Sequence, residues 1–220
     1  MAVTIKSSRE IELMRKAGEI LAKTHEELQK AIHPGMSTMD IDRLGEKIIR
    51  SHGCIPSFKN NNVYPASICV SVNDEVVHGI PSRTRILKEG DIVSLDAGVI
   101  YKGYHSDAAR TWAVGEISEE AKKLIDVTRQ SFFEGIKFAK AGNHLGDISA
   151  AIQSYAESFG YGVVRDLVGH GIGMHLHEDP EVPNFATKKK GILLRPGMTL
   201  AVEPMINMGT YEVLWLDDDW

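Results

Sequence analysis

Apolar residues recur every three or four positions in four segments of the chain, as they do along one face of an amphipathic helix. The first segment is followed by Pro34-Gly35, and the second begins at Thr38, the expected N-cap, and stops before Gly53. We therefore predict two pairs of helices, at Ser8–Ala31, Thr38–Ser51, Glu119–Ala139 and Leu145–Phe159.

Strand-like alternation of apolar and polar residues appears at Ser67–Val72 and again at Asp91–Val114, where Tyr101–Tyr104 forms a turn. Asp96 and Asp107 stand at nearly equal distances from this turn, so hairpin pairing brings them opposite or nearly opposite each other. Facing carboxylates repel across a sheet, and burying an unpaired carboxylate is costly. A single aspartate usually finds a basic or backbone partner, whereas two facing aspartates favour a shared cation.

The two halves of the chain repeat each other at a constant shift of 107 residues. LKEGDIVSLD at Leu87–Asp96 aligns with LRPGMTLAVE at Leu194–Glu203, and Ala31–Gly53 aligns with Phe138–Gly160. Two separate segments in one register indicate an internal duplication.

The repeat predicts a single α+β domain over residues 1–220, with halves at roughly 1–115 and 116–220. We expect its helices to cover one face of a curved, mostly antiparallel sheet with pseudo-twofold symmetry. A chain of 220 residues is long enough to bury a sizeable core.

Charge and apolar content exclude several classes of protein. The net charge is −5 and the one basic cluster is Lys188-Lys189-Lys190, so we predict no direct nucleic-acid binding.

We expect no signal peptide, because charged residues interrupt the N-terminal segment, and no apolar run approaches the roughly 20 residues of a membrane span. Cys54 and Cys69 form no CxxC pair, which is typical of a reducing compartment. We expect a cytoplasmic monomer.

Metal-ligand residue types gather in the second half of the chain. The duplication brings Glu203 to the strand position of Asp96, which adds a third carboxylate. His170 stands between two glycines in GHGIGMHLHEDP, and Gly162–Gly173 is expected to form a strand beside Glu203. Carboxylates with an imidazole suit Mn, Fe or Co better than a thiolate-rich structural zinc site, and several bridging carboxylates favour two ions.

These ligands and their flanking motifs resemble type I methionine aminopeptidases along the whole chain. The motifs that carry the resemblance are IKSSREIELMRKAGEI, CVSVNDEVVHGIPS, DAGVIYKGYHSDAARTWAVG, GHGIGMHLHEDPEVPNF and PGMTLAVEPM. The resemblance implies the pita-bread fold, in which two matching halves enclose two divalent metal ions (Co, Mn, Fe or Zn). It also implies removal of the initiator methionine from nascent polypeptides when the second residue is small, with at most transient ribosome contact.

The resemblance assigns roles to the metal-binding residues. It implies that Asp96 chelates one metal, that Asp107 bridges both, and that His170 and Glu203 ligate the other. A hydroxide held between the ions would attack the scissile carbonyl, and Glu203 would be the general base.

Substrate contacts are implied in the same way. His177 would hydrogen-bond the substrate and its developing oxyanion, and His78, in VVHGIP, would contact the residue after methionine. The methionine side chain would be lined by Phe58, Tyr64, Cys69, Leu176 and Trp220. Asn61-Asn62-Val63 departs from the family's Tyr-His-Gly, which puts the second-residue preference in doubt, and Asn73 matches a monovalent-cation site. Of the remaining histidines, His175 is expected to be structural, and the others are expected to be ordinary surface or cap residues: His25, His33, His52, His105 and His144.

The repeat also predicts an acid equivalent to Asp107, but Leu214 occupies that position, and later acids occur only at Asp217-Asp218-Asp219. The resemblance places the last bridging glutamate on a strand beyond Trp220, so we expect the chain to lack its last strand or strands. It would then be a fragment, or the aspartates would substitute, or it would be a short peptide-binding paralogue. We expect weak metal binding and slow hydrolysis from the chain as given.

The nearest rival enzyme class is the Xaa-Pro aminopeptidases and prolidases, which share the fold and metal ligands. We expect no extra N-terminal domain of the kind those enzymes carry, and His78 within VVHGIP favours the methionine-specific class.

Overall fold

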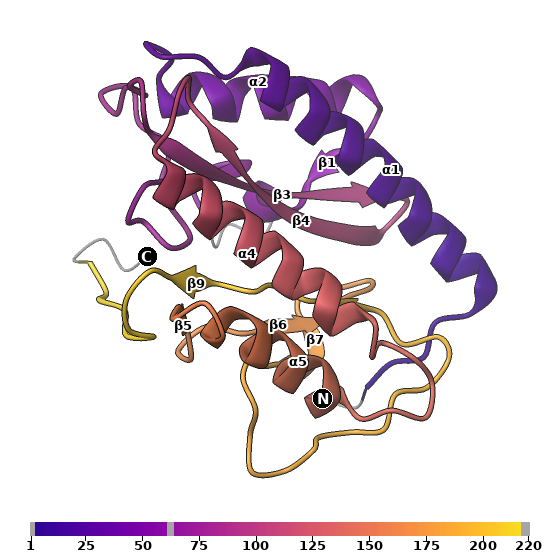
Figure 1. Ribbon diagram of the computed structural model, residues 1–220. Coiled ribbons are helices and arrows are strands. Elements are labelled where there is room, and N and C mark those ends of the chain that lie inside the picture. The colour runs from indigo at the N-terminus through magenta and orange to yellow at the C-terminus, as the bar shows by residue number, and fades with distance from the viewer. Residues whose placement is uncertain (1–2, 61–63, 217–220) are drawn as a thin grey trace. The chain divides into compact units, whose positions relative to one another are not determined.

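The computed structural model describes residues 3–60 and 64–216 (Figure 1). The helices are α1 (Ser8–Ala31), α2 (Thr38–Ser51), α3 (Ser57–Asn60), α4 (Glu119–Ile136) and α5 (Leu145–Glu157). The strands are β1 (Ile55–Pro56), β2 (Ile68–Val72), β3 (Ile92–Tyr101), β4 (Tyr104–Ala113), β5 (Gly162–Val163), β6 (Gly169–Gly171), β7 (Glu178–Val182), β8 (Leu200–Ala201) and β9 (Ile206–Asn207). Within the described residues, no helix is long and apolar enough to cross a membrane.

The chain divides into two compact units, which are described separately. Among the described residues, the N-half unit comprises those within Ser8–Ser118 together with Gly173–Leu176 and residues 215–216. The C-half unit comprises residues 3–7 together with Glu119–Ile172 and His177–Leu214. The prediction of a single domain is not tested by this division and stays a prediction.

Strand β3 is the centre of the sheet in the N-half unit. It pairs antiparallel with β4 along one edge, and with β2 and β1 along the other. Helices α1 and α2 cover one face of this sheet, as Figure 1 shows. Helix and sheet residues bury each other because both faces are apolar; the core includes Ala17, Leu21, Leu28, Ile41, Ile49, Val70, Val93 and Leu95.

The C-half unit has shorter strands and a helix pair. Strand β6 lies between β7 and β8, and β5 pairs separately with β9. Helices α4 and α5 pack together, and the core residues are Leu145, Ile148, Ile152, Val182 and Leu194. The first described residues of the chain belong to this unit, because the Lys6 backbone N–H donates to the Gly197 carbonyl at 2.8 Å.

The internal duplication predicted from the sequence is visible in the backbone. The isolated bridges Ser37↔Ile86 and His144↔Leu193 are related by a shift of 107 residues (144 − 37). Glycines with positive φ recur at the same shift, in the pairs Gly35 and Gly142, Gly53 and Gly160, and Gly90 and Gly197. A positive φ lies in the left-handed region of backbone conformation, which glycine adopts without strain. The two halves therefore repeat in backbone conformation as well as in amino-acid sequence.

The N-cap prediction for α2 is wrong by one residue. Ser37, not Thr38, is the N-cap, and its hydroxyl accepts a hydrogen bond from the Asp40 backbone N–H at 3.2 Å. The Thr38 hydroxyl instead hydrogen-bonds the Ser82 backbone, accepting from its N–H at 2.9 Å. Serine and threonine are both favoured at the N-cap, so amino-acid preference alone could not decide between Ser37 and Thr38.

Candidate metal and substrate site

The two aspartates of the β3–β4 hairpin lie on one face of the N-half sheet, diagonal to each other. Asp96 pairs with Ala109, and Asp107 pairs with Gly98. The two-residue turn of Lys102 and Gly103, with φ of 49° and 85°, sets this register. The offset from direct opposition is two residues, and an even shift keeps both carboxylates on the same face.

Four of the residues predicted to line the methionine side chain are described, and we call them the methionine lining. All four are buried: Phe58 is 8% exposed, Tyr64 6%, Cys69 3% and Leu176 7%. The rings of Phe58 and Tyr64 meet edge to face with centroids 6.3 Å apart. Cys69 pairs with Asp96 across β2 and β3, so this lining adjoins the carboxylates. Burial, and then the nearby Asp96, raise the pKa of the Cys69 thiol, which therefore stays protonated. Trp220 lies outside the described residues, as do Asn61-Asn62-Val63.

His78 is held in an uncommon backbone conformation, with φ of 58°. The next residue, Gly79, presses against β2, where an added Cβ would lie 2.3 Å from the Val70 carbonyl oxygen. The Gly79 carbonyl accepts hydrogen bonds from the Tyr64 hydroxyl at 2.7 Å and the Val70 N–H at 2.9 Å. Burial lowers the pKa of His78 while Asp107 acts in the opposite direction, so the ring is neutral near pH 7.

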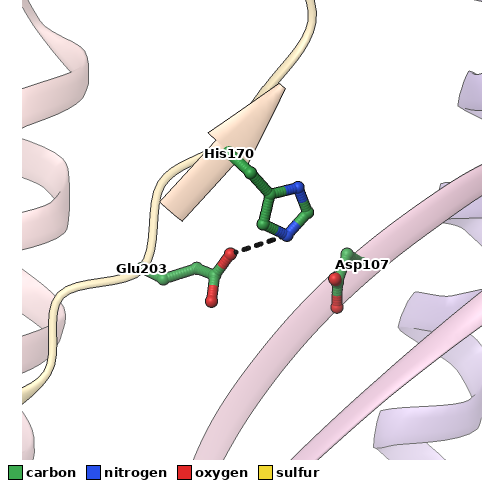
Figure 2. A group of neighbouring side chains, drawn as sticks. All are labelled: Asp107, His170 and Glu203. Carbon is green, nitrogen blue, oxygen red and sulfur yellow. Dashed lines mark ion pairs between the residues drawn. The ribbon is translucent and has the colours of Figure 1, made fainter. Parts of the chain in front are cut away.

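His170 and Glu203 come together within the C-half unit. His170 pairs with Ala201 across β6 and β8, and Glu203 follows two residues later. The His170 Nδ1–H donates to the Gly171 carbonyl at 2.8 Å, which leaves Nε2 facing the Glu203 Oε1 at 3.2 Å (Figure 2). An imidazole lone pair facing a carboxylate oxygen requires either a second proton or a cation bound by both. A backbone carbonyl on the other ring nitrogen is the usual arrangement around a metal-binding histidine.

Two contacts of this unit were not found from the sequence. The Asn184 side chain is fully buried, at 0% exposure, and its Nδ2 donates to the Glu203 carbonyl at 2.7 Å. The Lys6 ammonium forms a buried ion pair with Glu178 at 2.6 Å. Glu178 directly follows His177, whose ring meets the His170 ring edge to face at 4.4 Å. The first contact joins residues 19 positions apart, and the second joins residues 172 positions apart.

The prediction that the remaining histidines are surface or cap residues is wrong for two of them. His25 and His105 are 5% and 6% exposed. The His25 Nε2–H donates to the Ala108 carbonyl at 2.8 Å, and burial lowers its pKa to about 4. His25 fits the apolar face of α1 as a neutral ring, which a helical pattern that counts histidine as polar cannot predict. By contrast, His144 is the N-cap of α5, as a cap residue should be.

Asn73 connects two strands. Its Nδ2 donates to Asp91 at 2.9 Å, and its Oδ1 accepts from the Ile92 backbone N–H at 3.0 Å. The predicted monovalent-cation site near this residue stays a prediction.

Three comparisons with known proteins agree on the family. Residues 12–219 match the model of metallopeptidase family M24. The methionine aminopeptidase of Clostridium acetobutylicum is 57% identical over 218 residues, which cover 99% of this chain and 87% of that protein. A crystal structure of methionine aminopeptidase from Thermotoga maritima is similar with a TM-score of 0.96 and 46% identity, over 100% of this chain and 88% of that one. Xaa-Pro dipeptidase from Bacillus anthracis has a TM-score of 0.79 and 32% identity, over 91% and 54% of the two chains.

Proposed function

The chain belongs to metallopeptidase family M24, and from that premise we propose that it removes the N-terminal methionine from peptides and nascent proteins whose second residue is small. The observation that carries the proposal is 57% identity to a methionine aminopeptidase over nearly the whole chain. The Xaa-Pro dipeptidase similarity is weaker in both identity and TM-score. The fold is the pita-bread fold of this family.

Divalent metal fits the residues that the chain offers. We propose that Asp96, Asp107, His170 and Glu203 together hold two ions. Within the C-half unit, the His170 Nε2 and the Glu203 Oε1 already lie 3.2 Å apart, as two ligands of one ion would. The donor set is oxygen-rich with one imidazole and no thiolate, because Cys69 is a protonated lining residue. This set suits Mn, Fe or Co, and less readily Zn.

Divalent ions at this position would polarise the scissile carbonyl and acidify the attacking water. The side chains of the protein move the protons and bind the substrate. We propose that the Glu203 carboxylate takes the proton of the water and delivers it to the leaving amine. The neutral His78 ring and His177 would hydrogen-bond the peptide on either side of the scissile bond, and His177 would stabilise the developing oxyanion.

The substrate side chain would lie on the lining of the N-half unit. Phe58, Tyr64, Cys69 and Leu176 offer two aromatic edges, a small thiol and an aliphatic group, and Trp220 belongs to the same proposal. A flexible, polarisable thioether packs well against such a surface. Because Cys69 adjoins Asp96, a methionine bound here would present its carbonyl near the carboxylates.

Release of free methionine from Met-Ala-Ser by the purified chain, after chelation and reloading with Mn²⁺, tests the proposal. Ala-Pro-Ser should not be cleaved. Glu203→Gln should lower kcat by about 100- to 10,000-fold, as expected for the loss of a general base. His177→Ala should lower it by about 100-fold or more, whereas the matched variant His175→Ala, at an exposed histidine without an assigned role, should retain wild-type kcat.

Cleavage of Ala-Pro-Ser in preference to Met-Ala-Ser would favour the prolidase class instead. Affinity for Met-peptides with no metal requirement and no turnover would favour a peptide-binding paralogue. We propose nascent polypeptides as the natural substrates and the cytoplasm as the compartment, with a monomeric enzyme that contacts ribosomes at most transiently. The two free cysteines are compatible with a reducing compartment.

A further inference from the structure

His105 lies on β4, two residues before Asp107 and on the same face of the sheet. It is 6% exposed, and its ring Nδ1 hydrogen-bonds the Ser57 hydroxyl at 3.0 Å. Ser57 is itself fully buried, begins α3, and directly precedes Phe58. The ring of His105 is therefore connected through one residue to the proposed methionine lining.

Ser57 has no room to approach the sheet more closely. The residue paired with Asp107 is Gly98, and a Cβ added there would lie 2.6 Å from the Ser57 Cβ. Close packing against Gly98 fixes the distance of Ser57 from β3, while the hydrogen bond to His105 fixes its direction. The position of Phe58, and of the Tyr64 ring that meets it, follows from both.

The backbone of His105 holds a second part of the lining. Its N–H donates to the Gly173 carbonyl at 2.8 Å, and the Gly173 N–H donates to the His175 carbonyl at 3.1 Å. This short turn leads into Leu176, which is 7% exposed. One residue of β4 thus contacts both the turn that carries Phe58 and the turn that carries Leu176.

We propose that His105 is a positioning residue that shapes the lining for an unbranched, methionine-length side chain. It acts through Ser57 on Phe58 and through its backbone on Leu176, and it touches neither the scissile bond nor the metal. The proposal rests on the proposed function, since it concerns how the same substrate side chain is recognised. Its loss should weaken recognition of methionine more than it slows the chemical step.

Steady-state kinetics on Met-Ala-Ser and norleucine-Ala-Ser separate these effects. His105→Leu should raise KM for both substrates by about tenfold, the size expected from a lost buried hydrogen bond, while kcat changes less than about twofold. Ser57→Ala removes the same bond from the other side and should give a similar KM. The effects of the two substitutions on KM should not add in the double variant, because both remove the same His105–Ser57 hydrogen bond.

His105→Asn places an amide near the position of Nδ1 and should recover most of the lost KM. The matched control is His52→Leu, at an exposed histidine beyond α2, which should behave as the wild type. If His105→Leu fails to fold, Ser57→Ala and His105→Asn decide the question.

The outcomes distinguish the two proposals. No turnover of Met-Ala-Ser by the wild-type chain would overturn the proposed function, and this inference with it. Measurable wild-type turnover, even if slow, with Ser57→Ala and His105→Leu lowering only thermal stability or lowering kcat at unchanged KM, would overturn the positioning role alone.

Discussion

The buried ion pair between Lys6 and Glu178 offers the sharpest test of how the C-half unit is built. The two side chains are only 5% and 9% exposed, and the Lys6 Nζ lies 2.6 Å from Glu178 Oε2. The Thr4 hydroxyl donates to the same oxygen at 2.6 Å. Glu178 is the first residue of β7 and directly follows His177, a proposed substrate-binding residue. Thr4 and Lys6 therefore hold the start of this strand in place.

Lys6→Met keeps most of the volume of the side chain and removes its charge. The Glu178 carboxylate then loses its ion pair with Lys6, and removing one partner of a buried pair costs about 3–5 kcal/mol. We expect a loss of that size in the free energy of unfolding, measured by urea denaturation followed by far-UV circular dichroism. Because the carboxylate causes the loss, adding Glu178→Gln to Lys6→Met should restore more than half of it.

Lys16→Met is the matched control. Lys16 and Glu19 form an ion pair at 3.0 Å with side chains about half exposed, so water replaces the lost contact and stability should not change measurably. The reasoning fails if Lys6→Met is as stable as the wild type. It also fails if the Lys6→Met, Glu178→Gln double variant is as unstable as Lys6→Met alone.

Two further predictions concern the N-half unit. His25 has a pKa lowered to about 4, so its burial stabilises the fold above the ordinary pKa of 6.5 and this contribution is lost as the pH falls towards 4. Between pH 7 and pH 4.5 the wild type should lose about 2 kcal/mol more stability than His25→Leu in urea denaturation, and parallel losses would contradict the assignment. Gly98→Ala should lower the free energy of unfolding by about 1–3 kcal/mol, because its Cβ would meet Ser57 at 2.6 Å. Gly18→Ala, in α1 where nothing lies within 4 Å of the new Cβ, should instead raise it slightly, and equal effects of the two would refute the packing argument.

The sequence was most informative where a pattern repeats. The shift of 107 residues predicted the duplicated backbone, and the same shift relates the Ser37 and His144 bridges. Alternation predicted the β3–β4 hairpin and put Asp96 and Asp107 on one face. The predicted turn at Tyr101–Tyr104 is confirmed, but with Tyr101 paired to Tyr104 the two aspartates are offset by two residues rather than directly opposite each other.

Contacts between distant polar residues could not be predicted from the sequence. Lys6 and Glu178 are 172 residues apart, and no periodicity connects them. The Asn184 side chain donates to the backbone carbonyl of Glu203. Every residue has such a carbonyl, so no sequence motif indicates this contact. The prediction that His105 is a surface or cap residue is wrong because the partner of its ring, the Ser57 hydroxyl at 3.0 Å, lies 48 residues away in the sequence.

The central claim is that carboxylates and an imidazole from the two repeats hold divalent ions in common. Anomalous scattering from a crystal grown with Mn²⁺ tests it most directly. The account predicts two manganese peaks, each within coordinating distance of side chains from the set Asp96, Asp107, His170 and Glu203. Manganese bound elsewhere, or none bound at millimolar Mn²⁺, would contradict it.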